Sequence, residues 1–268
     1  MKTVADALSC GDIAPFEARV LLERVSGIAR VSLIARPEAV LSDAQAAAFL
    51  AAVDRRRAGT PIAYLVGERD FHGITLQVTP DVLIPRPETE LLVDFALERL
   101  PPGGAMLDLG TGSGAIALAV KHARPDVQVK AVDRSAAALA IARVNATRLG
   151  LAVDFVEGNW FEPLGSQRFA VIVSNPPYVA EGDRHLSQGD LRFEPKCALV
   201  GGADGLAAIR SICADAPRHL QTGGWLCVEH GAGQELSVRK LFERAGLESV
   251  ESRPDLAGTA RVVIGRQG

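Results

Sequence analysis

Short apolar runs alternate with helical stretches in the C-terminal part of the chain. The apolar runs predict seven strands, at Met106–Leu109, Val127–Val132, Val153–Val156, Val171–Ser174, Trp225–Val228, Ser249–Arg253 and Val262–Ile264. Helical stretches fall between them, notably at Ala115–His122, Ala136–Leu149 and Gln234–Ala245. Because such alternation requires right-handed crossovers, we expect an α/β domain with a mostly parallel sheet and helices on both faces. Ligands of such sheets gather beyond the carboxyl ends of the strands.

The first 70 residues have a different pattern, with short helices separated by helix-ending residues. Pro15 can occupy the first turn of a helix that ends at Gly27. Ser42 and Gln45 form a capping box for an Ala-rich helix that ends at Gly59. Apolar residues recur at three- and four-residue spacing in both segments. This pattern predicts a small helical bundle.

A strand pattern separates these two parts. Ile74–Val78 alternates apolar and polar residues, and Pro80-Asp81 interrupts the pattern before Val82. We therefore expect a helical domain over residues 1–70, a β-hairpin linker over 71–84 and the α/β domain over 85–268. The length of 268 residues agrees with more than one domain.

Composition excludes several broad classes of protein. Hydrophobic residues make up 48% and charged residues 23%, as in ordinary globular proteins, which argues against disorder or a collagen-like repeat. The formal net charge is −3, and residues 1–73 carry nine basic and nine acidic side chains. Without a basic excess we expect no stable nucleic-acid binding.

The four cysteines, Cys10, Cys197, Cys213 and Cys227, form no C-x-x-C pair and lie at no zinc-finger spacing from a histidine. We expect free thiols and no metal site. No run approaches the roughly 18 apolar residues of a membrane span, and no signal-peptide core precedes Cys10. These observations predict a cytoplasmic protein that does not engage a membrane, and we expect a monomer.

A glycine-rich loop, Gly110-Thr111-Gly112-Ser113-Gly114, follows the first predicted strand of the α/β domain and opens a helix. Glycines let a ligand approach the main chain, and free N–H groups at the helix start face it. The loop with Ala115 also satisfies G-x-G-x-x-A. A nicotinamide or flavin dinucleotide is therefore as compatible with this loop as another adenosine cofactor.

Two further strand ends supply candidate cofactor contacts. Asp133 ends the second predicted strand, 23 positions after Gly110. A carboxylate there can accept hydrogen bonds from both ribose hydroxyls of an adenosine. Trp160 follows the third strand and can pack against adenine.

The stretch Asn175-Pro176-Pro177-Tyr178 follows the fourth predicted strand and separates these alternatives. Two prolines hold the backbone in a rigid loop. This rigidity would present the Asn175 side-chain oxygen and the Pro176 carbonyl as two acceptors, with the flat face of Tyr178 beside them. The arrangement suits a planar –NH2 group, which a dinucleotide enzyme does not need.

An amide nitrogen is a poor nucleophile because its lone pair is delocalised into its carbonyl. Paired acceptors can overcome this. Acceptors that hold both hydrogens favour a pyramidal nitrogen and stabilise the positive charge that develops on it. The matching electrophile is the methyl group on the sulfonium of S-adenosylmethionine. Positioning of that methyl group can supply much of the rate.

These motifs together resemble the class I S-adenosylmethionine-dependent methyltransferases, and more specifically the HemK/PrmC family of release-factor glutamine methyltransferases. The resemblance extends over nearly all of the chain after Thr60. It includes Tyr64–Gly67, Phe71-His72-Gly73, Val82–Glu90, Gln188–Pro195 and Glu229-His230-Gly231. The stretch Leu83–Glu90 is far more specific than Asn-Pro-Pro-Tyr, which DNA adenine methyltransferases also carry.

The resemblance implies a Rossmann-like seven-stranded sheet with a helical substrate-binding domain. It also implies methylation of the side-chain amide of the glutamine in the Gly-Gly-Gln loop of class-one release factors, in support of translation termination. The cofactor contacts carried over are Gly110, Thr111, Gly112, Ser113, Gly114, Asp133, Trp160 and Asn175. The substrate contacts are Asn175, Pro176, Pro177 and Tyr178, with Asn175, Pro176 and Tyr178 as catalytic residues.

One position departs from the family pattern, because Asn159 stands where relatives often have an acidic residue or Ser. Three other activities remain open from the sequence: methylation of a ribosomal-protein glutamine, N6 methylation of DNA adenine, and non-catalytic binding by the same fold.

Overall fold

The computed structural model describes residues 2–10 and 13–268. It divides the chain into two compact units. The first comprises the chain up to Glu68 together with Ser187–Phe193, and the second comprises Arg69–Leu186 and Glu194–Gly268. Within residues 2–10 and 13–268, none of the helices combines the length and the hydrophobicity that a membrane span requires.

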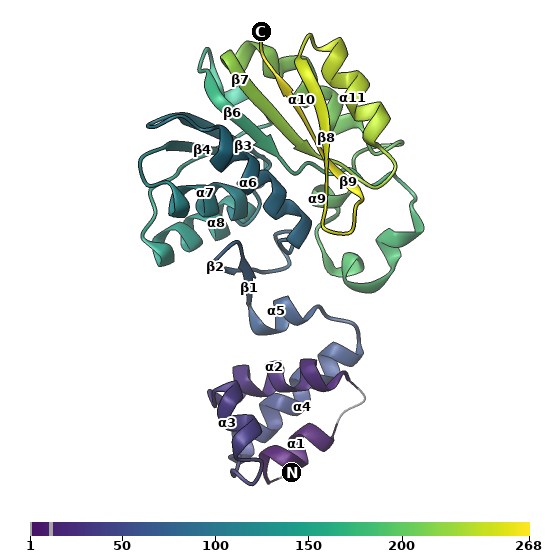
Figure 1. The fold of residues 1–268 in the computed structure, drawn as a ribbon. Helices are drawn as coiled ribbons and strands as arrows, with labels where there is room; N and C mark the ends of the chain where they lie inside the picture. Colours follow the sequence, from purple (N-terminus) through teal and green to yellow (C-terminus); the bar gives the residue numbers. More distant parts are fainter. Residues whose placement is uncertain (1, 11–12) are drawn as a thin grey trace. The chain divides into compact units, whose positions relative to one another are not determined.

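The first unit is built from short helices, as the sequence pattern predicts (Figure 1). These are α1 (Val4–Ser9), α2 (Pro15–Ser26), α3 (Arg30–Ala35), α4 (Asp43–Arg57) and α5 (Ile62–Val66). Gly27 ends α2 in a left-handed conformation, and both hydrogen bonds of the Ser42–Gln45 capping box are present. The core contains Leu21, Leu22, Phe49 and Val53, each at most 1% exposed.

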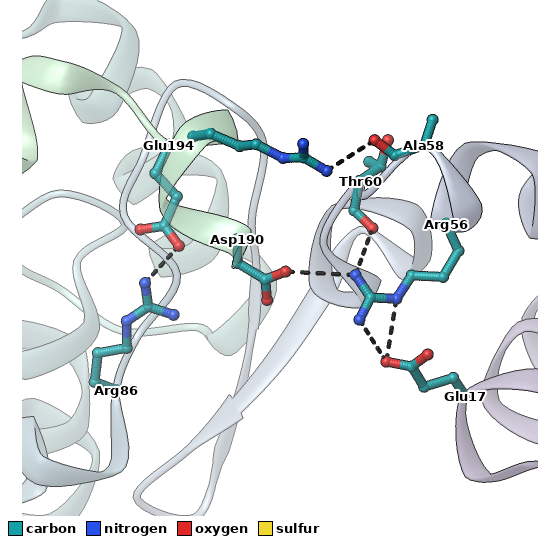
Figure 2. Close-up of polar contacts among 8 residues, drawn as sticks. Glu17, Arg56, Ala58, Thr60, Arg86, Asp190 and Glu194 are labelled. Carbon is teal, nitrogen blue, oxygen red and sulfur yellow. Dashed lines mark hydrogen bonds and ion pairs between the residues drawn. The ribbon is translucent and has the colours of Figure 1, made fainter. Parts of the chain in front are cut away.

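A segment distant in the sequence completes this unit. Residues 187–193 include a 3₁₀ helix, η4 (Gly189–Phe193), which follows η3 (Arg184–Ser187). The Arg56 guanidinium donates to Glu17 and to the Thr60 carbonyl, and lies 3.4 Å from Asp190 (Figure 2). Arg192 donates to the Ala58 carbonyl at 3.0 Å. The expected helical domain over residues 1–70 did not include this segment, because these contacts span 134 positions and no local pattern records them.

The second unit begins within the first strand of a two-stranded hairpin, which consists of β1 (Glu68–Phe71) and β2 (Ile74–Gln77). The linker expected over residues 71–84 therefore contains the second strand, whereas the first strand starts earlier. His72, with φ of 43°, and Gly73, with φ of 79°, form the turn. The 3₁₀ helix η1 (Pro87–Thr89) then leads into α6 (Glu90–Arg99).

The central sheet has the strand order β5-β4-β3-β6-β7-β9-β8. Its members are β3 (Ala105–Leu109), β4 (Gln128–Asp133), β5 (Asp154–Glu157), β6 (Phe169–Ser174), β7 (Leu220–Glu229), β8 (Glu248–Pro254) and β9 (Ala260–Arg266). The first five of these are parallel, while β9 runs antiparallel to both β7 and β8. The predicted seven-stranded, mostly parallel α/β sheet is confirmed.

Helices cover both faces of this sheet (Figure 1). Alternate residues of β3 and β6 point to opposite faces, so that Met106 packs with α6 and α7 (Ala115–Ala123), whereas Leu107 packs with α10 (Ala207–His219) and α11 (Glu235–Arg244). The remaining helices are α8 (Ala136–Leu149), the short α9 (Lys196–Leu199) and the 3₁₀ turn η2 (Glu162–Leu164). α10 was not among the helices predicted from the sequence.

Candidate active site

The second unit contains a cavity of about 310 Å³ beyond the carboxyl ends of β3, β4, β5 and β6. This is the edge at which a parallel sheet binds its ligands. The volume lies at the lower end of the range for small-molecule sites, which is roughly 300–1,000 Å³. Residues from all four strand ends line it, namely Gly110, Thr111, Gly112, Ser113, Asp133, Trp160, Asn175 and Pro177.

The glycine-rich loop turns through backbone conformations that favour glycine. Gly110 has φ of 73° and Gly112 has φ of 57°, a region that costs other residues about 1–2 kcal/mol. The amides of Gly110 and Thr111 both donate to the Val132 carbonyl, at 2.8 and 3.1 Å. These bonds hold the loop against the end of β4, with its main chain on the cavity wall.

Asp133 joins two elements of the site. One carboxylate oxygen accepts from the Gly112 amide at 2.8 Å, and the other accepts from the Ser135 amide at 2.9 Å. An ionised carboxylate has about four acceptor positions, so two remain for a ligand. The residue therefore shapes the glycine loop and retains acceptor capacity for a ligand in the cavity.

Asp108, in β3, holds the same glycine loop through hydrogen bonds. It was not predicted as a site residue. Its Oδ2 accepts from the Thr111 hydroxyl at 2.6 Å and from the Ala117 amide at 3.2 Å, and the side chain is fully buried. Burial raises the pKa of Asp108 to about 7, partly offset by these two hydrogen bonds. Its position at the start of the glycine stretch was the available sequence signal.

Trp160 has an unusual backbone, with φ of 51°. A Cβ placed on Gly110 would lie 3.5 Å from the Trp160 ring, so the indole packs against the glycine loop. Left-handed conformations at bulky residues are uncommon and cluster at functional sites. Asn159, beside it, lines the cavity and donates to Glu162 at 3.2 Å.

Asn175 faces the cavity from the end of β6. Its amide nitrogen donates to the Thr89 hydroxyl at 2.9 Å, and Thr89 in turn donates to Glu229 Oε2 at 2.7 Å. Thr89 is 4% exposed and Glu229 is 1% exposed. Burial raises the pKa of Glu229 to about 7, while hydrogen bonds from Thr89 and Tyr178 oppose the rise.

Tyr178 lies on a different, smaller cavity of about 190 Å³ together with Arg86, Glu88, Glu229 and Arg261. Its hydroxyl donates to Glu229 Oε1 at 3.1 Å, and burial raises the pKa of the phenol. The Tyr178 carbonyl accepts from the Gln234 side chain at 3.0 Å. Both ends of this tyrosine are therefore held in place.

The structure brings most of the predicted site residues to one cavity, with three exceptions. Gly114 does not line it; a Cβ there would lie 2.9 Å from Leu118 and 3.3 Å from Ala142, so this glycine permits close helix packing. Pro176 is buried, and its side chain does not line the cavity either. Tyr178 is the third, on the smaller cavity.

Hydrogen bonds connect Asn175, Thr89, Glu229 and Tyr178. The sequence did not predict Thr89 or Glu229 as site residues. Both lie within stretches that carry the family resemblance, Leu83–Glu90 and Glu229-His230-Gly231. That signal marked the segments. It could not connect two residues 140 positions apart.

Comparison with known proteins gives two family matches. Residues 2–67 match the PrmC N-terminal domain, and residues 87–190 match the methyltransferase small domain. Relatives of this chain from several bacteria carry the name release factor glutamine methyltransferase. The protein from Burkholderia pseudomallei is 48% identical over 98% of this chain and 96% of its own length. That from Bordetella pertussis is 49% identical over 98% of both chains. The Escherichia coli protein is 46% identical over 93% of this chain and 91% of its own.

Solved structures with the same fold are more distant in sequence. A methyltransferase from Pyrococcus furiosus has a TM-score of 0.57 and 20% identity, and the match covers 82% of this chain and 98% of that one. The 16S rRNA N2 G1207 methyltransferase of T. thermophilus, solved with AdoMet and guanosine, has a TM-score of 0.55 and 21% identity, over 75% of this chain and 50% of that one. At this identity the likeness concerns the fold alone.

Proposed function

Since this chain belongs to the family of release factor glutamine methyltransferases, as its relatives at up to 49% identity show, we propose that it methylates the glutamine side chain in the Gly-Gly-Gln loop of class-one peptide-chain release factors. The methyl group is transferred from S-adenosylmethionine to the amide nitrogen, N5. The family membership predicted from the sequence is confirmed. We infer the substrate from the name that these relatives carry.

The cavity residues fit an adenosine cofactor. The glycine loop lets a ligand lie against its main chain, Asp133 retains acceptor capacity for ribose hydroxyls, and Trp160 supplies an apolar face. S-adenosylmethionine, when bound, supplies a methyl group on a positively charged sulfur. Gly110, Thr111, Gly112, Ser113, Asp133 and Trp160 would hold it.

The observation that carries the proposal is the position of Asn175 on this same cavity. Its side-chain oxygen and the Pro176 carbonyl would be the two acceptors for the substrate –NH2 group, with Pro177 beside them on the cavity wall. The amide nitrogen would form its new N–C bond as the sulfur–methyl bond of the donor breaks and leaves a neutral thioether, while these acceptors stabilise the positive charge on the nitrogen, which then releases one proton to solvent. No strong base is needed before transfer.

We further propose that the protein acts in the cytoplasm as a monomer, without stable binding to nucleic acid. Translation termination takes place in that compartment. The near-neutral charge, −3 over 268 residues, offers little affinity for a phosphate backbone.

The test is methyl transfer measured side by side on three substrates. Purified protein and tritiated S-adenosylmethionine are incubated with a release factor, with ribosomal proteins and with double-stranded DNA. Incorporation into the release factor alone is expected, and it should disappear when the glutamine of the Gly-Gly-Gln loop is changed to Ala. Transfer to ribosomal protein or DNA, with none to the release factor, would overturn the proposal.

A further inference from the structure

Two buried residues outside the Asn-Pro-Pro-Tyr turn, Thr89 and Glu229, form a hydrogen-bond chain that begins at Asn175. The Thr89 hydroxyl lies 2.9 Å from Asn175 Nδ2 and 2.7 Å from Glu229 Oε2. Glu229 Oε1 receives the Tyr178 hydroxyl at 3.1 Å. The Glu229 carboxylate thus lies between the first and last residues of the turn and is connected to both.

The number of available hydrogens decides which group donates and which accepts in the hydrogen bonds from Asn175 through Thr89 to Glu229. An ionised carboxylate only accepts, and a hydroxyl has one hydrogen to donate. When Glu229 is ionised, Thr89 therefore donates its hydrogen to it and has only lone pairs left for Asn175. A lone pair requires the –NH2 side of the amide, so the Asn175 nitrogen faces Thr89 and its oxygen faces the other way.

We propose that Thr89 and Glu229 are positioning residues that fix the orientation of the Asn175 amide, so that its oxygen rather than its nitrogen meets the substrate. An Asn side chain is nearly symmetric in shape, and sterics alone cannot choose between its two orientations. The reversed orientation places a donor against the substrate –NH2 group, which is also a donor. This inference rests on the proposed function and deepens it.

Protonation of Glu229 would remove the preference for one orientation of the Asn175 amide. A carboxylic acid can donate to Thr89, which frees the Thr89 hydrogen for the Asn175 oxygen and admits the reversed amide. The charged and titratable groups around Glu229 are Tyr178, Glu88, Arg86 and Arg261, which line the smaller cavity with it. Glu88 disfavours the ionised form and Arg261 favours it.

Kinetics of matched variants test the proposal. Thr89→Val keeps the shape and removes the hydroxyl, whereas Thr89→Ser keeps the hydroxyl. Glu229→Gln keeps the shape and adds a donor. We expect Thr89→Val and Glu229→Gln to lower kcat on the release factor by about 10- to 100-fold, with KM changed less than about threefold. Thr89→Ser should restore most of the rate.

The pH profile adds a readout that a merely structural role would not change. Wild-type kcat should fall toward acid pH as Glu229 takes up a proton, and this limb should be absent in Glu229→Gln. Equal rates for Thr89→Val and wild type, or equal losses in Thr89→Val and Thr89→Ser, would overturn the proposal. An acid limb that persists unchanged in Glu229→Gln would do the same.

Nuclear magnetic resonance tests the orientation without any substrate. The Asn175 side-chain –NH2 signals are assigned by their loss in Asn175→Ala. One of these protons should exchange slowly with water in wild type and Thr89→Ser, and rapidly in Thr89→Val. Equal exchange in all three would overturn the inference. Slow exchange in a wild-type protein that does not methylate release factor would support the positioning and reject the proposed function.

Discussion

The Asp133 carboxylate accepts a hydrogen bond from the Gly112 amide at 2.8 Å, and so connects the end of β4 to the glycine loop that follows β3. Gly112 adopts φ of 57° at this contact. The residue predicted to hold the cofactor ribose therefore also holds the loop predicted to face that cofactor.

Loss of this carboxylate should weaken cofactor binding. Hydrogen bonds to charged groups contribute about 1.5–3 kcal/mol, so Asp133→Ala should raise the Kd for S-adenosylhomocysteine by roughly 10- to 100-fold. Isothermal titration calorimetry measures this change. Asp81→Ala removes another carboxylate from the same cavity wall. An equal loss in both variants would contradict a specific role for Asp133.

Loss of the Asn175 side chain should affect transfer more than folding. Asn175→Ala removes the proposed acceptor for the substrate amide and should lower kcat by about 10²-fold or more. The side chain makes its hydrogen bond to Thr89 at the cavity wall, so the melting temperature should change little. Near-full activity on release factor would refute the role of Asn175.

Stability should depend on pH through Glu229. Its pKa is about 7 in the folded protein, above the usual 4.5, so the folded state binds more protons between these values. Folding stability consequently falls as pH rises through this range, by at most about 1.4 kcal/mol per pH unit for one group. Glu229→Gln removes this contribution.

Urea denaturation at pH 5, 6, 7 and 8 measures the effect. The variant should gain stability relative to wild type as pH rises. Asp108, whose pKa is also about 7, contributes with the same sign in both proteins and cancels in the difference. A difference that stays constant with pH would show that Glu229 does not titrate in this range.

Gly59 should control the packing of residues 187–193 in the first unit. A Cβ on Gly59 would lie 1.6 Å from the Arg192 guanidinium, and the backbone has φ of 97°. Gly59→Ala should therefore displace Arg192 and speed amide hydrogen exchange across residues 187–193. Gly67→Ala is the matched control, since Gly67 has φ of 81° and nothing within 4 Å of an added Cβ. Equal exchange in both variants would show that backbone strain alone is responsible.

Cysteine reactivity should report on cofactor binding. Cys10 and Cys197 are exposed, whereas Cys213 and Cys227 are buried, which raises the pKa of both thiols. Iodoacetamide should label only Cys10 and Cys197 in the folded protein, as measured by mass spectrometry. Cys197 lines the cavity, so S-adenosylhomocysteine should slow its labelling and leave that of Cys10 unchanged. Equal rates with and without ligand would place the ligand elsewhere.

Local stereochemistry accounts for what the sequence by itself determined. Short apolar runs between helical stretches identified all seven strands of the central sheet. Gly27 identified the end of α2, and the Ser42–Gln45 capping box identified the start of α4. The glycine loop and Asp133 lie at strand ends, and the carboxyl ends of parallel strands meet at one edge. Their shared cavity was therefore predictable from the order of strands and motifs.

Only the tertiary structure decided which distant side chains meet. Thr89 and Glu229 are 140 positions apart, and Arg56 and Asp190 are 134 positions apart. Tyr178, three residues after Asn175, faces a different cavity because its hydroxyl finds Glu229. A periodic pattern encodes the conformation of neighbouring residues. Hydrogen bonds between distant segments depend instead on how the strands and helices pack, which no local pattern contains.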